Sequence, residues 1–208
     1  MPLSRNTTIV NVGYRSTNFW VVSAGRNRLL FDLGWPGMLG PLLANLKRKD
    51  IPLKEIRCGI ASHYHIDHAG CAQELKNQGM RLIVTPEQAD AIPAMKRWTK
   101  PADNYVEIVT SDNLLLGTSQ SRAFLANMGI AGEIVHTPGH SDDSVSLVLD
   151  NGAGFTGDLT SEVTIGTEDP EVVSRSWRLL RDMGVTTVYG GHGPPRPLDA
   201  MTIPERLT

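Results

Sequence analysis

The stretch HYHIDH, residues 63–68, places three histidines and one aspartate within six residues. Imidazole and carboxylate groups are the ligands that Zn²⁺ and related metal ions prefer. The short, mostly apolar run of residues 56–61 directly before it predicts a strand, so the ligands should lie on the loop that leaves this strand. Because side chains two apart in an extended chain point to the same side, His63 and His65 can hold one ion together. We expect the other two ligands, which come after the chain turns, to face a second ion.

Three further candidate ligands lie downstream, and each follows a predicted strand on a loop that contains glycine. They are His140, Asp158 and His192, in the sequences TPGHS, FTGD and GGHG. Glycine permits the tight turns and the close backbone approach that a crowded metal site requires. In α/β proteins the groups that leave strand ends meet at one edge of a sheet, so we expect these residues to join the first four.

The ordered set of ligands resembles the metallo-β-lactamase-fold superfamily of metal-dependent hydrolases. The signature His-x-His-x-Asp-His matches residues 63–68, and residues 17–22 and 30–34 resemble the opening strands of the family. The resemblance implies that His63, His65 and His140 hold one metal ion, that Asp67, His68 and His192 hold a second, and that Asp158 bridges the two.

The resemblance implies an α/β fold, a four-layer αββα sandwich of two βαβ-like halves, in a single domain over residues 1–208. The pattern of apolar residues agrees with alternating strands and helices in layers. The predicted strands lie near residues 7–12, 17–24, 27–32, 56–61, 81–85, three times within 133–157, and at 185–190. The predicted helices lie near residues 38–49, 69–79, 86–98, 119–128 and 170–183.

Two divalent ions, Zn²⁺ before Mn²⁺ or iron, would support hydrolysis without a serine or cysteine nucleophile. Two neighbouring dications require a shared anionic ligand, and a carboxylate can bridge where a neutral imidazole cannot. A metal-bound water loses its proton near neutral pH, and the resulting hydroxide is the expected nucleophile. We expect Asp67 to act as a catalytic residue that orients this nucleophile and later carries a proton.

Several polar residues near the ligands have other predicted roles. Asp32 and Asp142 are candidates to accept a hydrogen bond from a ligand imidazole. His136 is expected to be a half-buried strand residue, and Tyr64 to pack in the core. Of the two cysteines, Cys58 is expected in the core, Cys71 has no activating partner in the sequence, and their spacing predicts no disulfide framework.

The segment from Trp98 to Leu116 fits neither helix nor strand, and long loops of this kind often line active sites. Trp98 and Tyr105 are therefore candidates for the substrate wall, although the segment could equally pack its own aromatic residues on the surface. Tyr14, between two early strands, is a third candidate, because the superfamily often uses that loop as a flap.

The composition of the chain limits the kinds of partner that we expect it to bind. The formal net charge of −2 argues against a nucleic-acid partner, and no apolar run is long enough for a membrane helix. Residues 1–8 lack the apolar core of a signal peptide, which favours a cytoplasmic location. We expect a small-molecule substrate, no membrane partner and a possible homodimer.

The family contains several kinds of enzyme, and a small ester, thioester or lactone hydrolase is favoured. Only about sixteen residues follow His192, so we expect no glutathione-binding C-terminal region. The bridging Asp158 disfavours a true β-lactamase but permits weak β-lactamase or phosphodiesterase activity. Persulfide dioxygenases of the superfamily use a single iron and a similar motif, so an oxidoreductase of that kind is an alternative. A non-catalytic metal-binding module is disfavoured because all seven ligands are present.

Overall fold

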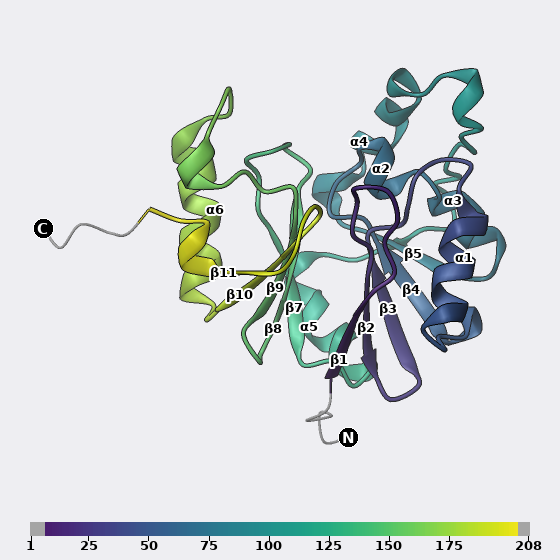
Figure 1. The fold of residues 1–208 in the computed structure, drawn as a ribbon, viewed down its shortest axis with the longest axis horizontal. Coiled ribbons are helices and arrows are strands. Elements are labelled where there is room, and N and C mark those ends of the chain that lie inside the picture. Colours follow the sequence, from purple (N-terminus) through teal and green to yellow (C-terminus); the bar gives the residue numbers. More distant parts are fainter. Residues whose placement is uncertain (1–6, 204–208) are drawn as a thin grey trace, which may run out of the picture.

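The computed structural model describes residues 7–203, which form two β-sheets packed face to face (Figure 1). The first sheet has the strand order β1-β2-β3-β4-β5-β6, and the second has the order β11-β10-β9-β8-β7. The strands of the first sheet are β1 Thr7–Asn11, β2 Trp20–Ala24, β3 Asn27–Phe31, β4 Ile56–Ile60, β5 Arg81–Val84 and β6 Leu114–Leu115. Those of the second are β7 Gly132–His136, β8 Val145–Leu149, β9 Ala153–Gly157, β10 Thr187–Gly190 and β11 Arg196–Pro197.

Each sheet combines an antiparallel meander with parallel crossovers. The strands β1, β2 and β3 are antiparallel neighbours, whereas β3, β4, β5 and β6 run parallel. In the second sheet β7, β8 and β9 are antiparallel, and β10 joins β9 in parallel after a helical crossover. Parallel strands require such crossovers, so the predicted βαβ units are present in both halves.

The helices cover the outer faces of the sheets or lie at their ends. They are α1 Leu39–Arg48, α2 Ile66–Ala69, α3 Ala72–Asn77, α4 Ala91–Ala94, α5 Thr118–Asn127 and α6 Pro170–Asp182. In Figure 1, α1 and α3 lie outside the first sheet, α6 lies outside the second, and α5 lies between the lower ends of the two sheets.

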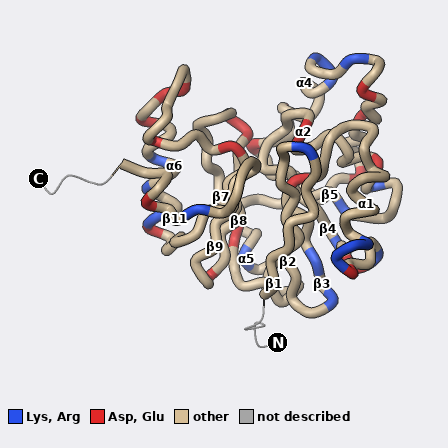
Figure 2. Tube along the Cα trace, viewed as in Figure 1, with Lys and Arg blue, Asp and Glu red and all other residues tan. Residues whose placement is uncertain are grey.

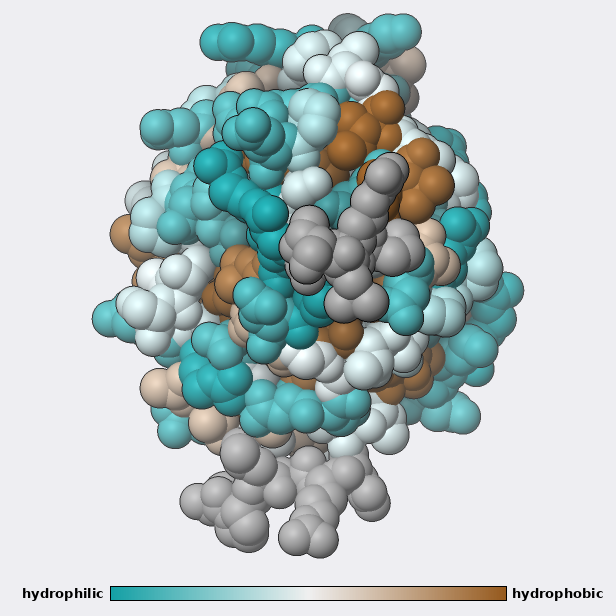
Figure 3. All heavy atoms as spheres, turned by 90° about the vertical axis from the view of Figure 1, so that its left-hand side faces the viewer, coloured by the Kyte–Doolittle hydropathy of each residue, from teal (hydrophilic) through white to brown (hydrophobic). Residues whose placement is uncertain are grey.

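The sequence of α6 shows why it forms where it does. Asp169 caps its N-terminus, since the carboxylate accepts hydrogen bonds from the backbone amides of Glu171 and Val172. Pro170 occupies the first turn, where no amide donor is required. The buried residues of the helix recur at intervals of three and four, so one face packs against the second sheet. Its outward side is mostly hydrophilic, with scattered apolar side chains (Figure 3).

Three apolar clusters separate the four layers. Alternate side chains of β2, β3 and β5 enter different clusters, because side chains of a strand point to opposite faces. One cluster lies between the first sheet and its helices, the second between the two sheets, and the third between the second sheet and α6. The predicted αββα sandwich is therefore confirmed.

Two predicted helices differ from the structure. The helix expected at residues 86–98 is instead two 3₁₀ turns on either side of the short α4. Pro93 lies within α4, and its ring would collide with the carbonyl group of Ala89 in a continuous helix, which is where the helical turns are interrupted. The helix expected at 69–79 starts earlier, at Ile66, and is interrupted at Gly70, where a Cβ would lie 2.3 Å from Pro36.

Two strands were not expected from the sequence. β6 lies within the segment after Trp98 and pairs with β5, and β11 pairs with β10 after the loop that contains His192. Each is only two residues long, which is too short for a periodic pattern. Among residues 7–203, the helices are all too short or too polar to traverse a lipid bilayer.

Candidate metal centre

All seven predicted ligands lie at the edge where parallel strands end. Residues 63–68 follow β4, His140 follows β7, Asp158 is the residue after β9, and His192 lies two residues after β10. The parallel pairing of β9 with β10 brings the last two together, and sheet-on-sheet packing brings them to the HYHIDH segment. The predicted convergence of groups from strand ends is confirmed, but the strands belong to both sheets rather than to one.

The HYHIDH segment changes conformation in the middle, as the sequence predicted. His65 has extended backbone angles, and its backbone carbonyl oxygen accepts a hydrogen bond from the amide of Ala69 at 3.0 Å. His65 is therefore the N-terminal boundary of α2. His63 therefore projects from the loop, whereas Asp67 and His68 project from the first turn of α2. This single bend directs the four side chains toward two different groups of partners.

One group consists of three imidazoles. His65 Nδ1 lies 2.9 Å from His63 Nε2 and 3.1 Å from His140 Nε2. The side chains of His63, His65 and His140 offer nitrogen atoms within 4.8 Å of one another, a separation that suits ligands of one ion. Three ring nitrogens that converge at this distance are typical of a zinc-type site with one open position.

The second group contains Asp67, His68 and His192, whose ligand atoms also lie within 4.8 Å of one another. Asp67 Oδ2 is 3.5 Å from both His68 Nε2 and His192 Nε2. His68 is fully buried, whereas the side chain of His192 is 42% exposed, so solvent and small molecules reach this group from the His192 side.

Asp158 lies between the two groups. Its Oδ2 is 3.2 Å from His68 Nε2, 3.3 Å from His192 Nε2 and 4.0 Å from His140 Nε2. Its other oxygen, Oδ1, is buried without a hydrogen-bond partner among residues 7–203. An unpaired buried carboxylate oxygen is costly in a folded protein, and a bound cation would satisfy it. Gly191 permits this packing, because a Cβ there would lie 2.3 Å from Asp158 Oδ1.

The electrostatics of the cluster depend on the balance of carboxylates and imidazoles. Burial, reinforced by neighbouring imidazoles, lowers the pKa of His63 well below its usual value. Burial also opposes protonation of His68, but the carboxylates of Asp32 and Asp158 outweigh it and raise the pKa of His68 well above its usual value. Burial by itself would raise the pKa of Asp158, yet the hydrogen bond from His68 and the charges of the other imidazoles lower it below its usual value. Asp158 therefore remains anionic and able to bind metal.

Asp32 lies beside the ligand imidazole of His68, as predicted, but as an ion-pair partner rather than a hydrogen-bond acceptor. It is fully buried directly after β3, and its Oδ2 lies 3.0 Å from His68 Nδ1. Its Oδ1 accepts the backbone amide of Ser62 at 2.7 Å. The Asp32 carboxylate faces Nδ1 as an ion-pair partner, although Oδ2 has no hydrogen-bond partner within residues 7–203, and Nε2 on the other side of the His68 ring faces Asp67 and Asp158.

The loop between β1 and β2 holds His192 in place, and the sequence did not indicate this. His192 Nδ1 lies 2.6 Å from the carbonyl oxygen of Ser16, and Thr17 forms an isolated β-bridge with His192. Thr17 Oγ1 donates to Asp67 Oδ2 at 3.1 Å and accepts from Trp35 Nε1 at 3.1 Å. Contacts that join residues so far apart in sequence leave no local pattern.

The prediction for Asp142 is wrong. Its side chain is exposed and makes no hydrogen bond or ion pair within residues 7–203, while its carbonyl oxygen lies 2.6 Å from His136 Nε2. The neighbouring Asp143 is the inward carboxylate, and it accepts the amide of Tyr64 at 2.7 Å. His136 is half-buried at the end of β7, and Tyr64 packs in the core, so both of those predictions are confirmed.

The three candidate residues of the substrate wall are Trp98, Tyr105 and Tyr14, and their contacts in the structure are with residues other than the predicted ligands. Trp98 is 66% exposed, and the hydroxyl of Tyr105 lies 3.8 Å from Met95 Sδ at the border of the core. Tyr14 packs edge-on against Phe19, and its hydroxyl accepts the amide of Trp35. Their substrate-binding role stays a prediction.

A cavity of about 180 Å³ lies beside the HYHIDH segment. Its lining includes Arg15, Trp35, Ile66 and Asn104. The guanidinium carbon of Arg15 lies 5.0 Å from the ring centre of Trp35, and Trp35 is linked through Thr17 to Asp67. The Trp35 side of the centre is therefore a candidate wall that the sequence did not indicate.

Comparison with known proteins agrees with this geometry. The family model of the metallo-beta-lactamase superfamily matches residues 12–192. The chain belongs to this superfamily. It is similar to an atrochrysone carboxyl ACP thioesterase of Emericella nidulans, with 30% identity over 86% of this chain and 52% of the relative. It is also similar to a hydroxyacylglutathione hydrolase of Rhodopseudomonas palustris, with 28% identity over 67% of this chain and 47% of the relative.

Solved structures share the superfamily fold. A metallo-beta-lactamase family protein of Thermus thermophilus superposes with a TM-score of 0.71 and 18% identity, over 94% of this chain and 76% of that chain. The chain spans about half the length of the curated relatives it matches.

Proposed function

We propose that this chain is a dinuclear metal-dependent hydrolase of a small ester, thioester or lactone. The observation that carries the proposal is the position of Asp158, which lies between two separate groups of three ligands and keeps one buried oxygen unpaired. The relatives named as an acyl-carrier-protein thioesterase and a hydroxyacylglutathione hydrolase favour a thioester among these substrates.

The residues fit two divalent ions, with Zn²⁺ favoured over Mn²⁺ or iron. His63, His65 and His140 would hold one ion, Asp67, His68 and His192 the other, and Asp158 would hold both. Bound there, the ions would supply a hydroxide nucleophile near neutral pH and polarise the carbonyl of the substrate. Five imidazoles and only two carboxylates surround this space, so the loaded centre keeps a net positive charge that suits a developing oxyanion.

Asp67 is the proposed catalytic carboxylate. The hydroxyl of Thr17 fixes one of its oxygens, Oδ2, which also faces His68 and His192. A carboxylate held in this way can accept a hydrogen bond from the attacking water and later pass a proton to the leaving group. Trp35, which donates to the same hydroxyl, limits the movement of Thr17 and helps to exclude bulk water from that side.

The proposal is tested by turnover of a panel of thioesters, esters and lactones, with the variant Asp158→Asn. The substitution keeps the volume of the side chain and removes the shared charge, so we expect hydrolysis to fall by at least about a hundredfold. Asp182→Asn is the matched control, because Asp182 is an exposed residue that precedes β10, whereas His192 follows β10, so the length of this strand separates it from the ligands. It should retain full activity.

Three outcomes would contradict the proposal. Full activity of Asp158→Asn would exclude a dinuclear mechanism. Preferred turnover of a β-lactam or a phosphodiester, added to the panel for comparison, would exclude the substrate class. Oxygen uptake with a persulfide, in the absence of hydrolysis, would instead identify an iron-dependent oxidoreductase.

A further inference from the structure

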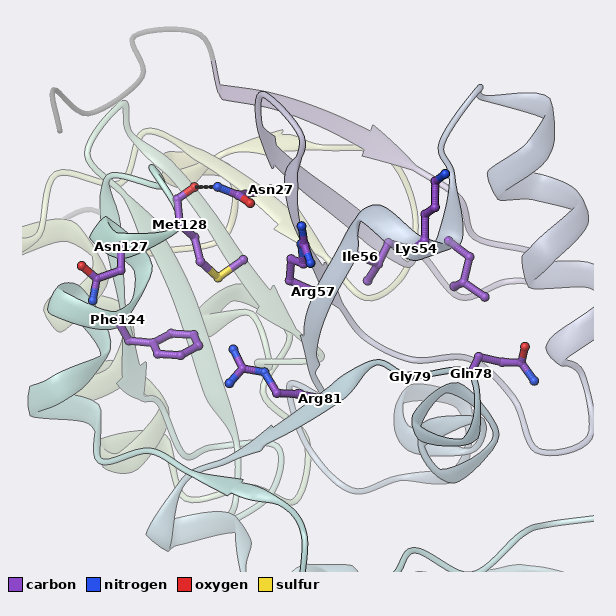
Figure 4. Close-up of a pocket in the computed structure, with 11 residues that line it drawn as sticks. Asn27, Lys54, Ile56, Arg57, Gln78, Gly79, Arg81, Phe124, Asn127 and Met128 are labelled. Carbon is purple, nitrogen blue, oxygen red and sulfur yellow. Dashed lines mark hydrogen bonds between the residues drawn. The ribbon is translucent and has the colours of Figure 1, made fainter.

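A cavity of about 480 Å³ lies at the end of the first sheet where β3, β4 and β5 begin. The metal centre lies at the other end of these strands. The cavity opens between the first residues of β4 and β5, the start of β3, and the end of α5 (Figure 4). Arg57 at its rim precedes His63 by six residues of mostly extended chain, which corresponds to roughly 20 Å. The cavity is therefore separate from the proposed hydrolytic site.

Two arginines at this cavity have no anionic partner in the part of the chain that the structure describes. Arg57 and Arg81 are exposed at the starts of the neighbouring parallel strands β4 and β5. Within residues 7–203, neither guanidinium group forms an ion pair with a carboxylate. The nearby Arg28 differs, because it is paired with Glu55 at 3.1 Å. Lys and Arg gather at the lower ends of β3 and β4 in Figure 2.

The side chains beneath these arginines are apolar or uncharged. Figure 4 shows Arg81 directed toward Phe124 and Arg57 directed toward Asn27, with Met128 between Asn27 and Phe124, whereas Lys54 points away. The guanidinium carbon of Arg81 lies 5.9 Å from the ring centre of Phe124. Asn27 is fixed by a hydrogen bond to the carbonyl oxygen of Met128 at 3.2 Å. The cavity thus combines two guanidinium groups that pair with no carboxylate of residues 7–203 with the apolar side chains of Phe124 and Met128, and none of its lining residues is acidic.

We propose that this cavity binds a small organic phosphate. The phosphate would lie between Arg57 and Arg81, and the apolar part of the ligand would contact Phe124 and Met128. Guanidinium groups bind phosphate oxygens through paired, charge-assisted hydrogen bonds, and the volume is within the range of small-ligand sites. A nucleic acid would require a longer basic track, but the adjacent Arg26 and Arg28 are already paired with Glu55.

The test is calorimetric titration of the metal-containing protein with phenyl phosphate. We expect saturation at one molecule per chain, and a fall in affinity of about tenfold or more in the double variant R57Q/R81Q. Phe124→Ala should weaken phenyl phosphate binding more than binding of inorganic phosphate. Arg26→Gln is the matched control and should bind normally, because this exposed residue lies outside the lining.

A metal centre can also bind phosphate, so Asp158→Asn is titrated in parallel. Retained binding in this variant, with loss in R57Q/R81Q, supports the cavity as the site. Loss of binding in Asp158→Asn with normal binding in R57Q/R81Q would assign the ligand to the metal centre and overturn the proposal. Absence of saturable binding at millimolar phenyl phosphate, or equal affinity in all variants, would overturn it as well.

Discussion

The role of Asp32 can be separated into a structural part and a metal-binding part by two substitutions. Asp32 has a left-handed backbone conformation with φ of 66°, which aspartate tolerates better than alanine. Asp32→Ala would leave the amide of Ser62 buried without its acceptor and would place alanine in this conformation. The unpaired amide costs about 1–3 kcal/mol and the backbone strain about 1–2 kcal/mol. We therefore expect the free energy of unfolding to fall by about 2–5 kcal/mol.

Asp32→Asn isolates the second part. Asparagine also tolerates the left-handed conformation and can still accept the Ser62 amide through its oxygen, so it should avoid both of these costs. It removes the negative charge that faces Nδ1 of His68 at 3.0 Å. Loss of such a partner typically lowers metal affinity by about 10–100-fold, and we expect that range here.

The assays are urea unfolding in the presence of a chelator, for stability, and competition with a chelator, for metal affinity. Asp50→Ala is the control for backbone strain, because Asp50 has a similar φ of 53° but is exposed. If Asp32→Ala were no less stable than Asp50→Ala, the buried hydrogen bond to Ser62 would have no energetic role. Unchanged metal affinity in Asp32→Asn would refute the orientation of His68 by Asp32.

Three further predictions concern other parts of the fold. Trp177→Ala should lower the free energy of unfolding, measured by urea denaturation, by about 3–5 kcal/mol, because the side chain is fully buried. Substitution of an exposed residue by alanine should leave this free energy nearly unchanged. Burial raises the pKa of Cys58 and Cys71 to about 12, so at pH 8 about one thiol in ten thousand is ionised. A disulfide reagent should therefore label these thiols only after unfolding. Rapid labelling of the native protein would contradict this prediction. Thr17→Val should weaken metal binding about tenfold in chelator competition, while Thr17→Ser, which keeps the hydroxyl bonded to Asp67, should not.

The sequence allowed much of the fold and the ligand cluster to be predicted because both depend on local patterns. Apolar strands ended at glycine-containing loops that carried His140, Asp158 and His192, and the parallel strands brought these loops to one edge. Asp32 could be predicted for the same reason, since it directly follows β3.

The remaining features depend on contacts between distant residues or on single-residue geometry. The hydrogen bonds that join the loop around Thr17 to His192 connect the two ends of the chain, so no window of sequence reveals them. Asp143 rather than Asp142 points inward, and both residues lie in a turn, where no regular alternation of side chains indicates which one faces the interior. The phosphate cavity likewise depends on the packing of α5 against the starts of β4 and β5, where Arg57 and Arg81 are isolated cations in the sequence.

The metal content of the purified chain tests the central claim most directly. Elemental analysis of protein isolated without added metal, with Asp158→Asn alongside, should give about two zinc or manganese ions per chain for the native sequence and fewer for the variant. One iron per chain, or an equal metal content in the two proteins, would contradict the assignment of Asp158 as a ligand shared by two ions.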